Sequence, residues 1–524
     1  MLIIYNARIY TLDAQQPAAS AVAIDGGRVL LIGSDQQILS EFEGRAEAQD
    51  MGGQVVLPGL TDAHIHLENY ALGLQKVDCE TPTRQECLQR VAERVRLTPP
   101  GEWILGHGWN QNNWPEGFGT AGELEAIAPR NPVYLTAKSL HAAWANHAAL
   151  RRANLSDGTP DPPGGRLGRD EHGSPDGILF ESAMALVSDA IPQASPEAVA
   201  RAIYGAQEVL WGMGLTGVHD FDRRRCFVAL QTLHRRGDLR LRVVKSIPID
   251  DLPHAVALGL RTGFGDDTLR IGSVKAFADG ALGPRTAAML QPYMGEPDNQ
   301  GMLLLDAEEL YERGRLAVEN GLSLAVHAIG DRANHEVLDA YAQLKKLEVG
   351  KNLRHRIEHV QLIHPGDAAR LTELGIIASM QPIHATSDML MADRYWGERA
   401  AFAYAWRTQL EQGAVLAFGS DAPVESPNPF WGLHAAVTRR RPDGTPGPDG
   451  WYPAQRLTIT EALQGFTSGA AYAAGLEDRL GKLAPGFLAD LILLDTDPFA
   501  CQPDGLRDIQ ALATMIGGEW VWKR

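Results

Sequence analysis

Cysteine is scarce in this chain of 524 residues. The four cysteines, Cys79, Cys87, Cys226 and Cys501, are scattered and form no C-x-x-C pair, so the sequence offers no disulfide framework. The first residues, MLIIYNARIYTLD, lack the basic region and the long apolar run of a signal peptide. We therefore expect a cytoplasmic protein that folds under reducing conditions.

Basic charge and long apolar runs are limited as well. The chain carries 48 Lys and Arg against 65 Asp and Glu, a formal net charge of −17. A protein that binds nucleic-acid phosphates needs a basic surface, and a membrane span needs about 18 or more apolar residues in succession. We therefore expect neither a nucleic-acid nor a membrane partner. The content of 44% hydrophobic and 22% charged residues is typical of a globular protein with a large core.

The two ends of the chain share a pattern typical of β-strands. Near the N-terminus lie the runs IIYNARIYTL and AVAIDGGRVLLIG, the second with a hairpin-type turn at Asp25-Gly26-Gly27. Near the C-terminus lie LADLILLDTD and ALATMIGGEWVWKR. We expect one small β-domain built from both termini, although two unrelated hairpins would give the same pattern.

Short β-type runs alternate with helical stretches in the middle of the chain. This alternation predicts parallel strands joined by helices, and eight such strands are enough to close a (β/α)8 barrel. The eight runs are VVLPGLTDAHIHL near residue 60, LTGVHDF, LRVVKSIPI, LRIGSVKAFADG, LSLAVHAIGD, RHRIEHVQL, IIASMQP and VLAFGSDAP.

Residues 67–200 interrupt this alternation after the first predicted strand. They contain two further strand-like runs, EWILGHGWN and PVYLTAKSL, and a polar stretch rich in Gly and Pro at 156–177. We interpret 67–200 as an insertion and 156–177 as a long loop or lid. A second long loop, 439–453, follows the eighth predicted strand.

Two histidines alternate at the end of the first predicted strand. His64 and His66 lie in DAHIH, and residues two apart in a strand point to the same face, so both imidazoles would meet at one point, as in a metal site. Asp62 shares this parity, and we expect it to orient one imidazole. The H-x-H pair alone is weak evidence, because many such pairs are merely exposed.

The ends of four other predicted strands carry residues that can also bind metals. Lys275, His327, His359 and Asp421 stand at the ends of strands 4, 5, 6 and 8 of the predicted barrel. The C-terminal ends of barrel strands form one rim, and active sites of such barrels lie there. We therefore predict that these four residues and the H-x-H pair form one metal site.

Each of these residues also has a purely structural explanation. The alternatives are His327 bonded to Asp331, His359 beside Glu358, Lys275 paired with Asp279, and Asp421 capping a turn before Pro423. Strand parity, however, puts Glu358 and His359 on opposite faces. Taken together, the six positions favour the metal site over these separate explanations.

A series of motifs along nearly the whole chain resembles one known family. The motifs are LPGLTDAHIHL, GHGWNQNNW, VKAFADGALGPRTA, VHAIGDRA, RIEHVQL, SMQPIHATSD, FGSDAPVESPNPFWGLHAAVTRR and GKLAPGFLADLILLDTDP. In this order they resemble the amidohydrolase superfamily, and within it the YtcJ-like branch (amidohydrolase family 3). The resemblance implies a distorted (β/α)8 TIM barrel flanked by a composite β-sandwich from both termini. On this basis we assign 1–55 to the sandwich, 56–455 to the barrel with its insertion, and 456–524 to the last barrel helices and the rest of the sandwich.

The resemblance also implies roles for the rim residues. His64, His66, His327 and His359 match the family's metal-ligand histidines, and Asp421 matches its aspartate that binds metal and transfers protons. Lys275 stands where many members carry a lysine carboxylated by CO₂, which bridges two metal ions. The alternative is a single ion with an unmodified lysine. Zn²⁺ suits these ligands best, although Fe, Mn or Co would also fit.

The expected reaction is hydrolysis of an amide or other non-peptide C–N bond in a small molecule. Hydroxide activated by the divalent metal would attack the carbonyl or amidine carbon, with Asp421 as the catalytic proton carrier. Two alternatives stay open: a catalytically silent or regulatory homologue, and a metal-dependent isomerase or decarboxylase on the same barrel. A small-molecule substrate is the expected partner, and a homodimer is also considered.

Five further residues are candidates for substrate binding. They are His107, Trp109, His141, Arg285 and His384. The aromatic and imidazole groups suit an organic substrate, and an arginine can hold a carboxylate with two hydrogen bonds. Core packing explains the tryptophan equally well, and a surface salt bridge explains the arginine equally well.

Overall fold

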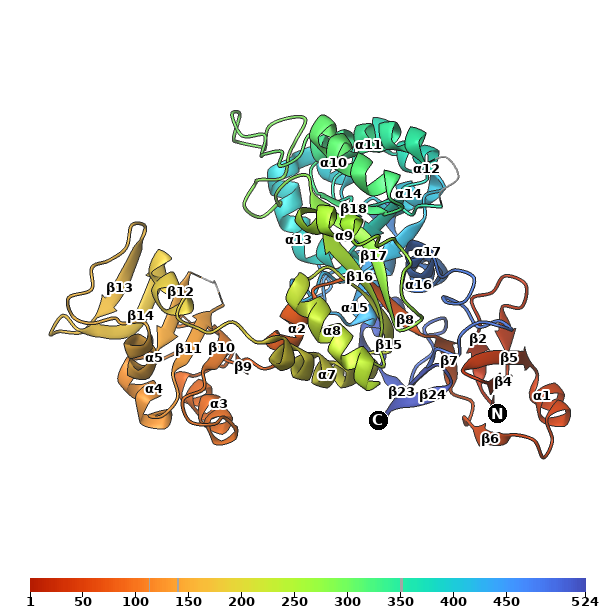
Figure 1. Ribbon diagram of the computed structural model, residues 1–524, viewed down its shortest axis with the longest axis horizontal. Coiled ribbons are helices and arrows are strands. Elements are labelled where there is room, and N and C mark those ends of the chain that lie inside the picture. Colours follow the sequence, from red (N-terminus) through yellow and green to blue (C-terminus); the bar gives the residue numbers. More distant parts are fainter. Residues whose placement is uncertain (113, 139–140, 349–351) are drawn as a thin grey trace. The chain divides into compact units, whose positions relative to one another are not determined.

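The computed structural model describes all residues except 113, 139–140 and 349–351 (Figure 1). The chain forms two compact units, one of Met1–Tyr70 with Ile203–Arg524 and the other of Ala71–Ala202. The chain leaves the first unit through α2 (Leu67–Gly73) and returns to it through α7 (Pro196–Gly212). No helix in the described part of the chain combines the length and the apolar character that crossing a bilayer requires.

The first unit contains an eight-stranded sheet in which every pair of neighbours is parallel. Its strands are, in order, β8 (Leu60–Ile65), β15 (Leu215–Asp220), β16 (Arg242–Pro248), β17 (Leu269–Phe277), β18 (Leu324–Ala328), β19 (Arg356–His359), β20 (Ile377–Met380) and β21 (Leu416–Phe418). The sheet closes just after β21, where the Asp421 amide donates to the His64 carbonyl at 2.7 Å and the His66 amide donates to the Ala422 carbonyl at 2.8 Å. These are the eight predicted strands, and the predicted (β/α)8 barrel is confirmed.

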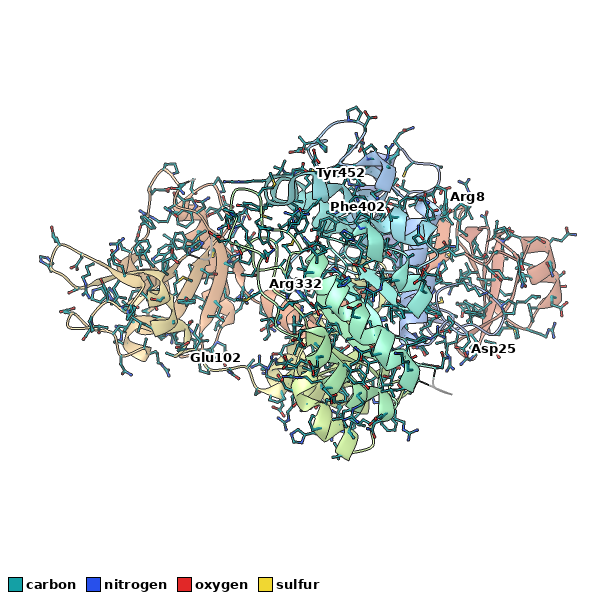
Figure 2. All side chains as sticks on the ribbon, turned by 90° about the horizontal axis from the view of Figure 1, so that it is seen from above. Arg8, Asp25, Glu102, Arg332, Phe402 and Tyr452 are labelled. Carbon is teal, nitrogen blue, oxygen red and sulfur yellow. The ribbon has the colours of Figure 1, made fainter. Side chains whose placement is uncertain are left out.

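Helices surround the strands, as Figure 1 shows for α8, α10 and α11. Local sequence fixes where they begin and end: Asp306 caps α10 by accepting a hydrogen bond from the Glu309 amide at 2.9 Å, and α8 stops at Gly237, whose φ is 75°. The helices are α8 (Arg224–Arg236), α9 (Leu252–Ala257), α10 (Ala307–Glu319), α11 (Asp331–Leu344), α12 (Arg370–Leu374), α13 (Pro382–Trp396), α14 (Trp406–Glu411), α15 (Pro429–Thr438), α16 (Ile459–Gly465) and α17 (Ser468–Ala474). In Figure 2, Arg332 marks the first turn of α11.

Two further sheets of the first unit form the β-sandwich that was expected from both termini. One has the order β5-β4-β1-β6 and the other the order β24-β23-β22-β7-β2-β3, so the second joins strands from both ends of the chain. Ile4 and Val22 of the first sheet pack with Ile9, Leu491 and Met515 of the second in one buried cluster. The elements are β1 (Leu2–Tyr5), β2 (Arg8–Tyr10), β3 (Ala18–Ala19), β4 (Ala21–Asp25), β5 (Arg28–Gly33), α1 (Asp35–Glu41), β6 (Glu47–Asp50), β7 (Val55–Pro58), β22 (Leu491–Leu494), β23 (Ala511–Ile516) and β24 (Glu519–Lys523).

The run that was predicted to be a single first barrel strand is divided at Gly59. Val55–Pro58 belongs to the sandwich as β7, and Leu60–Ile65 begins the barrel as β8. A side chain at Gly59 would place its Cβ 2.3 Å from Oγ1 of Thr216 on β15. The absence of a side chain therefore lets the chain pass closely over β15 between the two sheets.

The second unit, Ala71–Ala202, contains a six-stranded sheet with its own core. Trp109, Trp114 and Trp144 are buried in that core, and each indole donates to a backbone carbonyl. Its elements are β9 (Val77–Asp78), α3 (Arg84–Leu97), β10 (Ile104–Trp109), α4 (Ala121–Ile127), β11 (Val133–Ala137), β12 (Ala142–Ala145), α5 (His147–Arg152), β13 (Gly165–Arg169), β14 (Pro175–Glu181) and α6 (Ala185–Ser188).

The prediction of a long loop or lid at 156–177 is wrong in part. This stretch contains β13 and the start of β14, which pair as an antiparallel hairpin at the edge of the sheet. The glycines and polar residues that indicated a loop occupy the turn, where Gly173 has a φ of 84°, and a half-exposed edge strand. An edge strand needs few apolar residues, so composition alone did not distinguish it from a loop.

Candidate metal centre

The six rim residues predicted from the sequence lie together at the C-terminal end of the barrel. Nε2 of His64 lies 3.5 Å, and Nε2 of His66 lies 3.3 Å, from the same oxygen of Asp421. The ring of His359 lies 5.2 Å from that of His64 and 4.6 Å from that of His327, measured between centroids. Lys275 completes the group, since its Nζ lies 4.9 Å from the ring centre of Phe221, and that ring stacks on His64 with 4.2 Å between centroids.

Two sets of donor atoms share Asp421. His64, His66 and Asp421 offer atoms that all lie within 4.8 Å of one another, and so do His359, His384 and Asp421. Imidazole nitrogens and carboxylate oxygens are ligands that Zn²⁺ and related divalent ions accept. The donor set therefore fits a divalent ion.

The second nitrogen of three rim histidines is already hydrogen-bonded. Nδ1 of His64 lies 2.6 Å from Oε2 of Glu358, and Nδ1 of His66 lies 3.2 Å from Oδ1 of Asp222. Nδ1 of His359 lies 2.7 Å from the side-chain oxygen of Gln381. Metal-binding histidines generally have such a partner on the nitrogen that faces away from the ion.

Asp62 does not orient an imidazole, contrary to the prediction from strand parity. Its carboxylate accepts hydrogen bonds from the backbone amides of His64 and Ser420, both at 3.0 Å, and from the Ser420 hydroxyl. It therefore fastens β8 to the turn that carries Asp421, which closes the barrel beneath the site.

The parity argument also fails at the end of β19. Glu358 and His359 were expected on opposite faces, yet Glu358 contacts His64 and the ring of His359 also packs against His64. The reason is that His359 has a φ of 79° and Val360 a φ of 41°, so the alternation of an extended strand stops there. Such conformations cost on the order of 1–3 kcal/mol each for residues other than glycine, and they concentrate at functional sites. Asp421, with a φ of 60°, shares this conformation.

Burial and charge set the ionisation of the site. Burial lowers the pKa of His64 to about 4. Burial also lowers the pKa of His66, but hydrogen bonds to Asp222 and Asp421 outweigh this effect and raise it to about 9. At Asp421, burial raises the pKa, whereas His64, His66 and His359 pull it well below its usual range. The site thus holds an ionised carboxylate among imidazoles, and a bound cation would displace the His66 proton.

Lys275 is a buried amine without a hydrogen-bond partner in the described structure. Its Nζ lies 4.9 Å from the ring centre of Phe221 and 4.8 Å from that of Phe277. Burial lowers its pKa to about 8. The alternative pairing with Asp279 is not seen, because the Asp279 carboxylate accepts the backbone amides of residues 288, 329 and 330 instead.

His327 is not held by Asp331, the structural alternative that its sequence context suggested. Its Nε2 lies 2.9 Å from the Gly280 carbonyl, whereas Asp331 accepts the Leu290 amide at 2.8 Å. Because a carbonyl only accepts hydrogen bonds, Nε2 of His327 donates and Nδ1 keeps its lone pair.

The five candidate substrate-binding residues have different surroundings. His384 lies in the rim group, with its ring stacked 6.2 Å from His359 and its Nε2 3.1 Å from the Ser420 carbonyl. Arg285 forms an ion pair with Glu296 at 2.9 Å, so the salt-bridge alternative describes it.

The other three candidates belong to the unit Ala71–Ala202 and have partners within it. Trp109 is buried in the core, as the packing alternative stated. His107 and His141 are exposed, and their Nδ1 atoms contact Thr136 at 2.8 Å and Glu181 at 3.0 Å.

Several residues at the site were missed from the sequence, chiefly Glu358, Arg356, Ser379 and Asp222. Arg356 and Glu358 alternate with an apolar residue in RIEH, so two charged side chains point into the barrel from one strand. Charges at interior positions are costly unless paired, and this pattern could have identified them.

A third group of potential ligands, Asp220, Asp222 and Cys226, is occupied by a lysine. Lys245 Nζ lies 2.9 Å from Oδ2 of Asp220 and donates to the carbonyls of Asp222 and Ser246. The ammonium already neutralises this pocket, so it does not form a second metal site.

The chain matches a known protein family in sequence and a solved structure in fold. Residues 47–522 match the model of the amidohydrolase family. The crystal structure of an uncharacterized metal-dependent hydrolase from Pyrococcus furiosus has a TM-score of 0.79 and 31% sequence identity, and the match covers 95% of this chain and 99% of that one.

Two relatives match this chain in sequence over nearly its whole length. The putative amidohydrolase YtcJ of Bacillus subtilis (strain 168) is 32% identical over 542 residues, which cover 98% of this chain and 98% of the relative. The N-substituted formamide deformylase of Arthrobacter pascens is 29% identical over 545 residues, which cover 100% of this chain and 98% of the relative.

Proposed function

Because the chain belongs to the amidohydrolase family, we propose that it is a metal-dependent hydrolase that cleaves an amide or other non-peptide C–N bond of a small organic molecule. The family match also confirms the resemblance that the sequence motifs indicated. The observation that carries the proposal is the meeting of the H-x-H imidazoles on one oxygen of Asp421. Hydrolysis of a C–N bond needs an activated water and a proton for the leaving nitrogen, and this arrangement supports both.

We assign the ion-binding role to six side chains: His64, His66, Lys275, His327, His359 and Asp421. A divalent ion held there supplies Lewis acidity and lowers the pKa of water toward ~7. We propose Zn²⁺ as the bound ion, because the donors are imidazoles and a carboxylate with no thiolate among them.

Asp421 is the proposed proton carrier. Its carboxylate is ionised, because the surrounding imidazoles hold its pKa well below its usual range. It can therefore accept a proton from water as the C–O bond forms and donate that proton to the nitrogen as the C–N bond breaks. The proton returns to the products, so the carboxylate ends the cycle as it began.

Lys275 is proposed to be carboxylated when two ions bind. Because burial lowers its pKa to about 8, a fraction of the amine is neutral near pH 7. The neutral Nζ would attack CO₂, forming an N–C bond and releasing one proton to water. The product is an anionic oxygen ligand that suits a cation better than an ammonium does. If only one ion binds, Lys275 stays unmodified.

The proposal is tested by replacing Asp421 with Asn. We expect Asp421→Asn to keep its metal content, measured by plasma emission spectrometry, and to lose turnover by a factor of about 10² or more. Formamides with different N-substituents are the first substrates to assay, with amine release as the readout, because a relative is named for that reaction. An Asp421→Asn protein that hydrolyses the same substrate at the wild-type rate would contradict the assignment.

A further inference from the structure

The two imidazoles of the H-x-H pair are each hydrogen-bonded to a different carboxylate on the side away from Asp421. Glu358 on β19 contacts Nδ1 of His64 at 2.6 Å, and Asp222, just after β15, contacts Nδ1 of His66 at 3.2 Å. On their other side both rings present Nε2 to the same oxygen of Asp421. The two rings thus present the same nitrogen to Asp421, and each is held by its own partner.

An ionised carboxylate fixes which nitrogen of an imidazole carries the proton. A neutral imidazole has one N–H and one lone pair, and either nitrogen can carry the proton. A carboxylate only accepts, so the ring nitrogen beside it must donate. Nδ1 of His64 and of His66 therefore carries the hydrogen, and in the neutral rings the lone pairs are on Nε2, the nitrogens that face Asp421.

Glu358 is itself held rigidly. It is fully buried and forms an ion pair with Arg356, whose Nη2 lies 3.0 Å from Oε2, and it accepts a hydrogen bond from the Ser379 hydroxyl at 2.7 Å. Arg356 in turn donates to the Ala63 carbonyl at 2.7 Å. Because a guanidinium is always charged in proteins, this ion pair holds Glu358 as a carboxylate. The carboxylate is thus ionised and has no room to turn away from His64.

Asp222 is held by a different set of donors. It accepts the Glu68 amide at 2.6 Å and the Asn69 side-chain amide at 2.9 Å, both from the first turn of α2. Its own carbonyl accepts from Lys245. Asp222 therefore orients His66 and also caps α2, the helix that begins at the residue after His66.

We infer that Glu358 and Asp222 are positioning residues that lock His64 and His66 in the tautomer and ring orientation needed to bind an ion through Nε2. The inference rests on the proposed function only in giving these two histidines an ion-binding role. Glu358 should have the larger effect, because the His64 side chain is 1% exposed and that of His66 is 27% exposed. A partly exposed ring such as that of His66 can exchange its carboxylate partner for water, whereas a fully buried ring cannot.

The test compares Glu358→Gln and Asp222→Asn with a matched control, Asp490→Asn. Asp490 also forms a buried ion pair with an arginine of a barrel strand, Arg242, at 2.7 Å, but it touches no imidazole. The dissociation constant for Zn²⁺ is measured by competition with a coloured chelator. We expect it to rise about 10–100-fold in Glu358→Gln and about 10-fold in Asp222→Asn, and to stay within twofold in Asp490→Asn.

A second measurement uses metal-free wild-type protein and needs no variant to fold. In nitrogen-15 histidine spectra, the imidazoles of His64 and His66 should each show a hydrogen-bonded Nδ1–H and an unprotonated Nε2 when neutral. Wild-type rings protonated on Nε2 alone, or a Zn²⁺ affinity in Glu358→Gln within twofold of wild type, would overturn the inference. Neither readout involves a substrate, so a protein that binds Zn²⁺ but hydrolyses no amide would contradict the proposed function alone.

Discussion

At the scale of single residues, the side chains at the rim of the barrel could be predicted from the sequence, because the fold brings the ends of the strands together. His64, Lys275, His327 and Asp421 are far apart in the chain, yet each ends a parallel strand, and those ends meet. The hydrogen-bond partners of these residues could not be predicted in the same way. Glu358 points into the barrel by the alternation of β19, but it reaches His64 only because β19 and β8 lie across the barrel from one another, and no local pattern encodes that contact.

Lys275 gives a prediction at this scale. If it is carboxylated, protein loaded with Zn²⁺ in the presence of carbon-13 bicarbonate should show a carbamate carbon resonance, since CO₂ is in equilibrium with bicarbonate. Lys275→Ala should lack the resonance and lose activity by a factor of about 10² or more, because an ion ligand is missing. A wild-type spectrum without the resonance, together with one bound ion per chain, would support the unmodified lysine instead.

At the scale of elements, the sequence predicted the eight barrel strands correctly and the insertion only in outline. Barrel strands are buried on both faces and can therefore show as continuous apolar runs such as Leu416–Phe418, which is buried throughout. The hairpin of β13 and β14 lies at a sheet edge, where polar residues and glycines are tolerated. Composition identifies buried strands more easily than edge strands, which explains why 156–177 was interpreted as a loop.

The passage from β7 to β8 gives a prediction for an element. Gly59→Ala would bring Cβ to 2.3 Å from Oγ1 and 2.4 Å from Cγ2 of Thr216, so β8 or β15 must shift. We expect the free energy of unfolding to fall by about 1–3 kcal/mol, the usual cost of overpacking, as measured by urea denaturation. Gly205→Ala is the matched control, because this exposed position in α7 has nothing within 4 Å and should gain up to about 1 kcal/mol. Equal effects of the two substitutions would contradict the steric argument.

At the scale of the whole molecule, the two compact units differ in how the chain builds them. The unit Ala71–Ala202 is contiguous in sequence, whereas the other is assembled from Met1–Tyr70 and Ile203–Arg524. In the second sheet of the sandwich, β22 lies between β7 from the N-terminal part and β23 from the C-terminal part. The sandwich core is therefore complete only when both ends of the chain are present.

This difference predicts opposite outcomes for two truncations. A fragment of residues 71–202 should fold by itself, because its three buried tryptophans and its sheet need no residue from outside. A chain that ends after Asp490 should not yield stable protein. It loses the four buried aliphatic side chains of β22, at about 1.5–3 kcal/mol each, and that loss approaches the whole stability of a typical domain, about 5–15 kcal/mol.

Near-ultraviolet circular dichroism and thermal unfolding measure both outcomes. The fragment of residues 71–202 should show the asymmetric tryptophan bands of a packed core and a cooperative transition, because Trp109, Trp114 and Trp144 lie within about 6 Å of one another in successive pairs. The chain cut after Asp490 should be insoluble or lack a cooperative transition. A soluble, cooperatively unfolding truncated chain would mean that β7 does not depend on β22, and that the sandwich is held together by its N-terminal strands alone.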